Sequence, residues 1–412
     1  MAPRKRFMAA AAAALAMVLA SCGSGDSGSE GGKTTLVWNM WSGSSAEVRA
    51  WNHLAGMVTD EYPNIKIEFQ TSSFNDYWTK LAAQASSGEA GCILGVQSLR
   101  AASISQLLVP LDDQLAGAGV DLADFNDTIV EGLQVEGEQL AVPYDFGPLV
   151  TFYNASRFKQ AGIEEPGVGW TVDDFMSAAQ ELTSDGKYGF AVYPIFDSVI
   201  PWALSMEDAM PVSEDGQLDL TSDGFTAATQ WYVDLVDKDQ VAPPVAASND
   251  PTPALSSFIA GDAAMVVDGP WQLVNVMDQA AFDVGVAPIP AGASGSRSQV
   301  AGSGFGISQT CEDPEEAMKA ISVLTGPEAL EYLAEQGRAY PARTAQQDAW
   351  FQDELVGAKE GLNAAIDSSV AVPSTANYTP VSQLFTQYGI QAVNGQMDVP
   401  TFLETVQQQS GG

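Results

Sequence analysis

Short strand-like runs alternate with amphipathic helical patterns along almost the whole chain of 412 residues. Residues 34–39 (TTLVWN) predict a first strand, residues 45–61 a helix and residues 65–70 (IKIEFQ) a second strand. A helix over 77–86 and a third strand over 93–96 continue the order. Because a helix between two strands carries the chain back across the sheet, this alternation favours parallel pairing. We therefore predict an α/β fold with largely parallel sheets.

The same alternation continues into the second half of the chain. The runs TFYNASRF and GFAVYP are strand-like, and residues 172–183 predict a helix with Thr171 at its N-cap. Residues 314–324 predict another helix, capped by Asp313 and with proline at its first position. No internal repeat or low-complexity linker interrupts this part of the sequence. Two lobes would therefore be joined by ordered crossings.

The first 33 residues have a different character. Three basic residues at 4–6 precede a mostly alanine stretch at 8–20, which is too short to span a bilayer and is typical of an export signal. The tetrapeptide Leu19-Ala20-Ser21-Cys22 resembles the bacterial lipobox, in which the cysteine receives a lipid and becomes the first mature residue. We expect residues 1–21 to be a lipoprotein signal peptide. An ordinary secretory peptide with an incidental cysteine is the alternative.

Residues 22–33 are expected to form a flexible tether, because residues 23–32 contain only Gly, Ser, Asp and Glu. The protein would then be an extracytoplasmic lipoprotein of the cell membrane, at the cell surface or in the periplasm. No later apolar run reaches membrane-spanning length, and the remaining chain is long enough for two domains.

Charge limits the possible partners. The formal net charge of -35 would become -38 once the three basic residues of the signal are removed. Such a surface repels nucleic acid and anionic lipid. Nine Trp and eleven Tyr provide large aromatic side chains that can act as ligand platforms, although core packing accounts for most of them.

Enzyme signatures in the sequence are weak. The GxGxxG pattern at 23–28 lies in the tether, without a preceding strand or a following helix. Ser156 and Lys159 form an SxxK pattern, but neither KTG nor SDN accompanies it. His53 is the only histidine, so no histidine triad or multi-histidine metal site can form, and a solvated or capping role is expected.

Pairs of acidic residues could in principle serve glycoside hydrolysis. With 52 acidic residues, however, such pairs are expected by chance and usually mark helix starts or solvated faces. The clearest pairs are Asp112/Asp113 and Asp173/Asp174. We therefore expect no catalytic residue, no cofactor and no metal.

Several separated segments agree on one family. In chain order they are LVWNMWSG, EYPNIKIEF, DYWTKLAAQASSGEA, LVPLDD, AVPYDFGPLVTFYNASRFKQAGI, GWTVDDFMSAAQELT, FIAGDAAMVVDGPW, VGVAPIPAG, GSGFGIS and EEAMKAISVLTGPEALEYLAEQGRAYPAR. This ordered set resembles the extracellular solute-binding proteins of bacterial ABC importers, in the carbohydrate-binding family of maltose-, glucose- and glycerol-phosphate-binding proteins. One departure is Gly91-Cys92, which stands where that family usually has Pro-Asp.

The resemblance implies a two-lobed periplasmic-binding-protein fold, with a ligand cleft between lobes that close like a hinge. It assigns residues 34–142 and 303–338 to lobe I, and residues 146–300 and 342–412 to lobe II. The implied hinge crossings are Pro143–Phe146, Ala301–Ser303 and Ala339–Pro341.

The resemblance also implies a set of ligand-binding residues. A sugar needs flat aromatic rings against its C–H face and polar groups around its hydroxyls. Trp41 lies just past the first strand, at the edge where open α/β sheets bind ligands, and Trp271 occupies the position at which the family presents an aromatic ring. Weaker aromatic candidates are Trp78, Trp202 and Tyr340. Hydrogen bonds to hydroxyls are expected from Asp145, Gln97, Arg343 and the backbone of Gly302, Ser303 and Gly304.

The expected ligand is a carbohydrate. Arg343 and Arg100 are the only arginines that the resemblance places near the cleft, which favours a neutral saccharide but leaves a polyol phosphate open. We expect a monomeric, lipid-anchored receptor that binds a mono- or oligosaccharide and delivers it to the membrane subunits of an ABC permease. The alternatives are a secreted glycoside-active enzyme, or a receptor of the same fold for another solute such as a peptide or polyamine.

The resemblance further implies a disulfide between Cys92 and Cys311. It places the returning strand GFGISQT antiparallel to the third strand of lobe I, so that the start of one lies against the end of the other. Neighbouring antiparallel positions lie within the reach of a disulfide, and exported thiols are normally oxidised. Two unpaired buried cysteines are the alternative.

Overall fold

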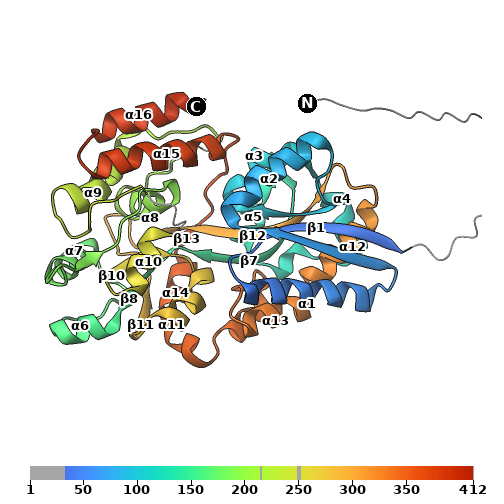
Figure 1. The fold of residues 1–412 in the computed structure, drawn as a ribbon, viewed down its shortest axis with the longest axis horizontal. Coiled ribbons are helices and arrows are strands. Elements are labelled where there is room, and N and C mark those ends of the chain that lie inside the picture. The colour runs from blue at the N-terminus through green and yellow to red at the C-terminus, as the bar shows by residue number, and fades with distance from the viewer. Residues whose placement is uncertain (1–32, 214–215, 248–251, 412) are drawn as a thin grey trace, which may run out of the picture. The chain divides into compact units, whose positions relative to one another are not determined.

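The computed structural model describes residues 33–213, 216–247 and 252–411 (Figure 1). Cys22, the signal peptide and almost all of the tether lie outside the described residues. Two separate larger sheets organise the described chain. We use the name lobe I for the seven-stranded sheet with its helices and lobe II for the four-stranded sheet with its helices. No helix among the described residues is long and apolar enough to cross a membrane.

The sheet of lobe I is mixed. Its path is β13-β12-β3-β1-β2, and β4 and β7 also pair with β12. β1 is parallel to β2 and β3, whereas β12 is antiparallel to β3, β4 and β7. The strands are β1 (Thr34–Trp41), β2 (Ile65–Ser72), β3 (Ile93–Gln97), β4 (Leu108–Val109), β7 (Val142–Pro148), β12 (Ser298–Ser308) and β13 (Ser369–Val370).

The sheet of lobe II has the order β11-β8-β10-β9. β8 is antiparallel to β10 and β11, and only β9 and β10 are parallel. The prediction of largely parallel sheets is therefore wrong. β1 with β2 and β3, β9 with β10 and β12 with β13 are parallel, and the other pairs of the two larger sheets are antiparallel. The strands are β8 (Val150–Asn154), β9 (Tyr188–Phe190), β10 (Ala263–Asp268) and β11 (Val284–Ala287), and a small hairpin joins β5 (Gln134–Val135) to β6 (Glu138–Gln139).

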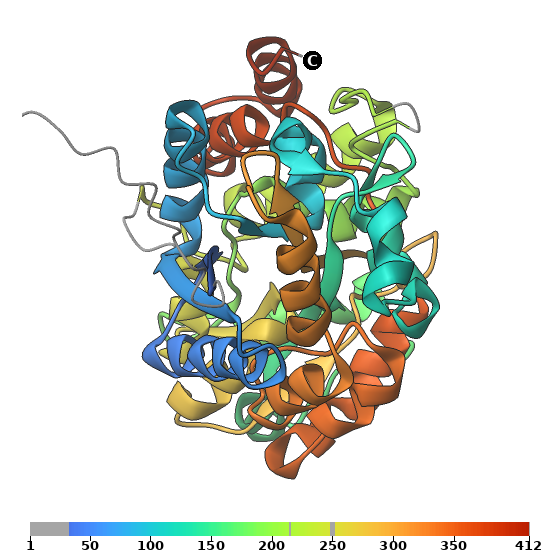
Figure 2. The same cartoon turned by 90° about the vertical axis from the view of Figure 1, so that its right-hand side faces the viewer.

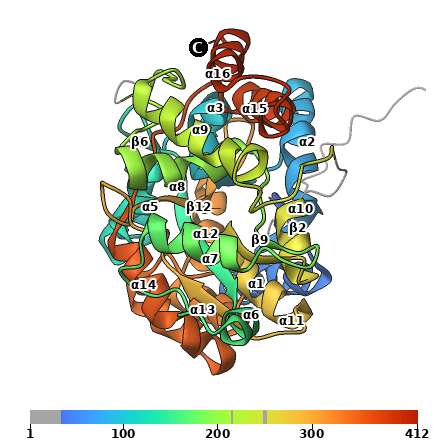
Figure 3. The ribbon, with the colours of Figure 1, turned by 90° about the vertical axis from the view of Figure 1, so that its left-hand side faces the viewer.

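Helices cover both sheets. In lobe I, α1 lies beside α12 and α13 (Figure 2). In lobe II, α15 and α16 pack against α9 (Figure 3). Lobe I has α1 (Ser45–Glu61), α2 (Phe74–Ser87), α3 (Ala101–Ile104), α4 (Asp112–Leu115), α5 (Asp127–Gly132), α12 (Pro314–Leu324) and α13 (Pro327–Glu335). Lobe II has α6 (Ala155–Ala161), α7 (Val172–Glu181), α8 (Phe196–Glu207), α9 (Asp223–Asp237), α10 (Pro253–Ile259), α11 (Leu273–Gln279), α14 (Lys359–Asp367), α15 (Tyr378–Val393) and α16 (Val399–Gln409).

Side-chain caps explain where these helices begin. Thr171 caps α7 in a reciprocal capping box with Asp174, as its sequence predicts. α2 begins three residues before the predicted start, because the hydroxyl of Ser73 accepts the backbone N–H of Asp76. Asp313 occupies the N-cap position before Pro314, but its side chain accepts no capping hydrogen bond, which corrects the expectation for α12.

The three expected crossing segments run side by side. β7 and β12 pair from Val142 to Pro148, with a register shift between Ser303 and Gly304 (Figure 1). The third segment joins the other edge of β7, where the N–H of Phe146 donates to Tyr340 O at 3.2 Å. A Cβ at Gly302 would lie 2.6 Å from the Asp145 carbonyl oxygen, so only glycine permits the close approach of the two strands.

Cys92 and Cys311 form a disulfide, as predicted, and the alternative of two unpaired thiols is wrong. Cys92 precedes β3 and Cys311 follows β12, which pair through Ile93 and Ile307. The Cα atoms of the two cysteines are 4.5 Å apart, and the bridge closes a sequence separation of 219 residues. Both ends lie in lobe I, so the bridge ties the first and returning parts of that lobe together.

Candidate ligand-binding site

Aromatic rings gather at the carboxyl end of β1. Trp41, the last residue of this strand, is half-buried, and its ring centroid lies 5.3 Å from Phe74, 5.2 Å from Tyr77 and 5.4 Å from Trp78. The last three residues share the first turns of α2, and the Tyr77 hydroxyl donates to Gly95 O at 2.9 Å. Trp41 and Trp78 thus lie together at the strand edge where α/β sheets bind ligands. We name these four residues the aromatic cluster.

Arg100 packs against the aromatic cluster. Only 9% of this residue is exposed, and its guanidinium carbon lies 4.8 Å from the Trp78 ring and 5.6 Å from the Phe74 ring. Its Nε donates to Gln97 Oε1 at 2.9 Å, so the predicted ligand residue Gln97 already has a protein partner. The indole N–H of Trp78 is buried without a hydrogen-bond partner. Trp78 therefore supports both the ring of Trp41 and the charge of Arg100.

Lobe II supplies a third ring and a carboxylate to Arg100. The guanidinium carbon lies 4.5 Å from the ring of Tyr378, at the start of α15. The Tyr378 hydroxyl lies 2.7 and 2.8 Å from the two carboxylate oxygens of Asp197 in α8, within hydrogen-bond distance of both. Burial raises the pKa of Asp197, while the Tyr378 hydroxyl and the Arg100 charge lower it. The guanidinium is therefore held by groups from both lobes.

Two carboxylates lie near the crossing strands. Asp145 in β7 is 8% exposed, and its Oδ1 is buried without a hydrogen-bond partner. Burial raises the pKa of Asp145 to about 7, hydrogen bonds from Ser303 lower it, and the negative charge of Glu47 raises it further. Glu47 in α1 accepts the backbone N–H of Gly43 at 2.6 Å. Burial raises the pKa of Glu47 as well, and the charge of Arg338 opposes this rise.

Trp271 is held close to the same strands. It lies in η5 (Pro270–Gln272), directly after β10, and is half-buried. A Cβ at Gly269 would lie 2.1 Å from its ring, and a Cβ at Gly147 in β7 would lie 2.2 Å from Pro270. Gly269 therefore leaves room for the Trp271 ring over its own backbone, and Gly147 leaves room for Pro270 against β7. Burial raises the pKa of the preceding Asp268 to about 7, against the hydrogen bond from the Gly269 N–H.

Two aromatic candidates are core residues, which corrects the expectation for them. Trp202 is fully buried in lobe II, with ring centroids 5.1 Å from Phe175 and 4.7 Å from Trp231. Tyr340 is 3% exposed and packs edge-on against Phe146 at 5.4 Å. Neither ring presents a face to a ligand. Trp202 lies on a helix that is apolar on nearly all sides, a pattern typical of a buried helix.

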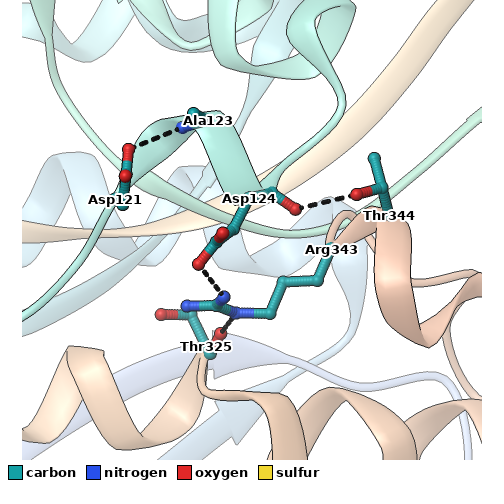
Figure 4. Close-up of polar contacts among 6 residues, drawn as sticks. All are labelled: Asp121, Ala123, Asp124, Thr325, Arg343 and Thr344. Atoms are coloured by element: carbon teal, nitrogen blue, oxygen red, sulfur yellow. Dashed lines mark hydrogen bonds and ion pairs between the residues drawn. The ribbon is translucent and has the colours of Figure 1, made fainter.

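Arg343 has a structural role in lobe I (Figure 4). Its Nε donates to Thr325 O at 2.7 Å, and its Nη1 pairs with Asp124 Oδ2 at 2.8 Å. The guanidinium also lies 4.4 Å from the Phe125 ring. These contacts correct the expectation that Arg343 binds ligand from lobe II. Gly302, Ser303 and Gly304 all pair with β7. Of these three residues only Ser303 has a polar side chain, and it lies beside Asp145.

Sequence reasoning missed several of these residues. Phe74 has a local signal, because it stands three and four positions before Tyr77 and Trp78 and so shares a helix face with them. Asp197 and Tyr378 have no local sequence signal, because both are far along the chain from Arg100 and only the fold brings the three residues together. His53 is exposed, as expected, and packs against Tyr332 with ring centroids 4.1 Å apart and the rings tilted by 34°. The described residues contain no group of three metal-ligating side chains.

Comparisons with known proteins fit this architecture. The model of a family described as bacterial extracellular solute-binding protein matches residues 45–331. A putative binding protein of Brucella abortus is 24% identical over an alignment of 285 positions that covers 64% of this chain. An uncharacterized lipoprotein of Streptomyces antibioticus is 26% identical over 339 residues, which are 79% of this chain and 73% of the relative. The chain spans 65% of the length of the Brucella relative, slightly less than two thirds.

Solved structures show the same fold. An ABC substrate-binding protein from Listeria monocytogenes, in complex with cycloalternan, matches with a TM-score of 0.83 at 22% sequence identity. The match covers 92% of this chain and 98% of that protein. The predicted two-lobed α/β fold is confirmed.

Proposed function

We propose, from the premise that this chain belongs to the bacterial extracellular solute-binding protein family, that it binds a neutral carbohydrate between its two lobes. The bound sugar is then presented to an ABC permease in the membrane, and the protein performs no chemistry on it. The ligand contacts the aromatic cluster from the side of lobe I and Trp271 from the side of lobe II.

One observation carries the proposal: an aromatic platform at the end of β1 and a buried, unpartnered carboxylate oxygen on β7 belong to the same sheet. The half-buried ring of Trp41 suits the C–H face of a sugar. Asp145 Oδ1 lacks a hydrogen-bond donor in the protein, and a buried acceptor without a partner is unfavourable. A sugar hydroxyl supplies that donor. The polar contacts of the site therefore favour a ligand rich in hydroxyl groups.

The arginines support a neutral ligand. Arg343 is paired with Asp124, and Arg100 is enclosed by three rings and faces Asp197. Neither guanidinium is left to bind an anionic ligand group. This argues against the polyol phosphate that the sequence left open. The cycloalternan complex of the Listeria protein, a carbohydrate complex in the same fold, is consistent with the proposal.

The proposal includes lipid anchoring at Cys22. The lipobox-like tetrapeptide and the Gly/Ser tether support it, as does the likeness to a protein described as a lipoprotein. Cys22→Ala is expected to remove the lipid while leaving a folded protein. Membrane partitioning of this variant through an acyl chain would contradict the anchor.

A thermal-shift screen of the mature chain tests ligand class. Neutral mono- and oligosaccharides are compared with polyamines and short peptides. A ligand at one hundred times its Kd adds about 2.7 kcal/mol to native-state stability. We expect stabilisation by at least one saccharide and none by the other two classes. Stabilisation by a polyamine or peptide alone would overturn the proposal, and release of reducing sugar would favour the enzyme alternative.

Tryptophan variants then test the location of the site. Trp41→Ala and Trp271→Ala are each expected to weaken binding of the identified saccharide about thirtyfold, or about 2 kcal/mol. Trp202→Phe is the matched control, because Trp202 is fully buried in lobe II. It should lower the unfolding midpoint while leaving Kd nearly unchanged. Unchanged affinity in both Trp41→Ala and Trp271→Ala would place the ligand elsewhere.

A further inference from the structure

We propose that residues 99–102 form a latch between the two lobes and that Arg100 positions lobe II for ligand binding. The latch segment follows β3 in lobe I and includes the first two residues of α3, and it docks on a receiving segment of lobe II, residues 372–378. Only the predicted effect on sugar affinity rests on the proposed function. The effect on the arrangement of the lobes follows from the contacts alone.

The latch segment contacts lobe II at three of its four residues. Leu99 is 2% exposed and belongs to the apolar cluster that contains β9, β10, α8 and α15, so it is buried in the core of lobe II. Val372 of the receiving segment belongs to the same cluster. On the other side of Arg100, the backbone N–H of Ala102 donates to Oγ of Ser374 in the receiving segment at 2.9 Å. Apolar and polar contacts therefore flank Arg100 on both sides.

Arg100 is the charged centre of the latch. Phe74 and Trp78 cover its guanidinium from lobe I, and Tyr378 covers it from lobe II. The carboxylate of Asp197, within hydrogen-bond distance of the Tyr378 hydroxyl, provides the opposite charge. Because the guanidinium is planar, it can stack on several rings, which the compact ammonium of lysine cannot do as well. Arginine is thus required for its shape as well as its charge.

The latch is connected to the crossing strands on both sides. β3, which leads into the latch segment, ends at Gln97, and Gln97 pairs with Ser303 of β12. β13, which leads into the receiving segment, pairs with Ser298 and Gln299 at the start of β12. Both halves of the latch are therefore attached to β12, a strand of lobe I whose first part contacts α8 of lobe II. A change in the angle between the lobes would separate the receiving segment from Arg100.

The latch is also connected to the proposed ligand site, through a shared ring. Trp78 contacts both Arg100 and Trp41. If a sugar rests on Trp41, the same cluster that receives it also holds lobe II in place. The position of Arg100 thus couples the arrangement of the lobes to the platform for the ligand.

Spin-label distance measurements test the latch without any ligand. Labels are placed at Asp60→Cys in α1 and Glu181→Cys in α7, two exposed positions on different lobes, with the disulfide intact and Cys22 removed. Arg100→Ala, Arg100→Lys and Tyr378→Leu are expected to broaden the interlobe distance distribution. Arg157→Ala is the matched control, because Arg157 donates to Leu182 O and Tyr188 O within lobe II. It should leave the distribution unchanged.

An unchanged distribution in folded Arg100→Lys and Tyr378→Leu would overturn the latch, even if Arg100→Ala failed to fold. With an identified saccharide, Arg100→Lys should also weaken binding about tenfold, a typical coupling between a conformational change and a site. If no saccharide binds but the distances broaden, the latch stands and the proposed function fails. If binding is strong in wild type and equal in Arg100→Lys, the positioning role fails while the proposed function stands.

Discussion

Arg100 and Arg343 have similar surroundings but join different parts of the molecule. Both are almost fully buried, and both lie against aromatic rings. The partners of Arg343, which are Asp124, Phe125 and Thr325, all belong to lobe I. The partners of Arg100 come from both lobes. The same interactions therefore stabilise one lobe in the first case and hold two lobes together in the second.

The carboxylates beside the two arginines differ as well. The Asp124 side chain is 58% exposed, so loss of Arg343 would leave it solvated. Asp197 is partly buried and has a raised pKa, so loss of Arg100 would leave a poorly solvated acid behind. We conclude that contacts within a lobe should affect unfolding, whereas contacts between lobes should affect the lobe arrangement and binding. Two predictions test this difference, and a third concerns Asp145 on the crossing strand β7.

The largest expected effect is on stability, from a covalent tie within lobe I. Cys92→Ser/Cys311→Ser removes a bridge across 219 residues of sequence separation. The chain-entropy model gives a loss of about 4 to 5 kcal/mol in the free energy of unfolding. Urea unfolding measures it. Sugar affinity at a temperature where the variant is folded should be unchanged, and a parallel loss of affinity would contradict the division between the two kinds of contact.

A smaller stability loss is expected from Arg343→Ala. The variant loses the hydrogen bond to Thr325 and the ion pair with Asp124. We expect the free energy of unfolding to fall by about 1.5 to 3 kcal/mol. Its interlobe distance distribution should match wild type, in contrast to Arg100→Ala. The paired measurement is urea unfolding together with the spin-label distances. Broadened distances in Arg343→Ala would show that the contrast between the two arginines is wrong.

The smallest effect concerns the pH dependence of stability. The pKa of Asp145 is raised to about 7 in the folded protein, so the folded state binds this proton more tightly than the unfolded state. Stability should therefore fall as pH rises from about 4 through about 7, by at most about 1.4 kcal/mol per pH unit for this group. Asp145→Asn should reduce that slope when unfolding is measured at several pH values.

Asp124→Asn is the matched control for the pH experiment, because Asp124 is largely exposed and its partner Arg343 is fixed in lobe I. The slope between pH 5 and pH 7.5 should be the same as in wild type. Asp268, with a pKa also raised to about 7, and Glu47 and Asp197, whose pKa values are raised by burial, contribute slope that persists in Asp145→Asn. Equal slopes in wild type and Asp145→Asn would exclude a special role for Asp145.

Local signals in the sequence predicted much of the fold. α1 begins and ends where its amphipathic pattern does, and Thr171 caps α7 as its position suggests. The pairing of Cys92 with Cys311 followed from the resemblance to a known family, which supplied the antiparallel order of β3 and β12. Helix ends and caps depend on residues that are neighbours in the sequence, whereas the disulfide depends on the strand order of the whole family.

The site was harder to predict, because burial depends on tertiary packing. A tryptophan on a helix looks the same in sequence whether it faces a core, as Trp202 does, or a cluster at a strand edge, as Trp78 does. Arg343 was expected to face ligand, but Asp124 lies 219 residues earlier and no local pattern reveals their ion pair. The same holds for Tyr378 beside Arg100.

The crystal structure of the mature protein with its best-stabilising saccharide tests the central claim most directly. We predict a sugar ring in van der Waals contact with Trp41, a hydroxyl donating to Asp145, and Arg100 still between Trp78 and Tyr378. A saccharide bound on the outer edge of lobe I, for example in the roughly 280 Å³ hollow lined by Gln70, Thr71 and Lys80, would contradict the account. So would a sugar between the lobes that touches neither Trp41 nor Asp145.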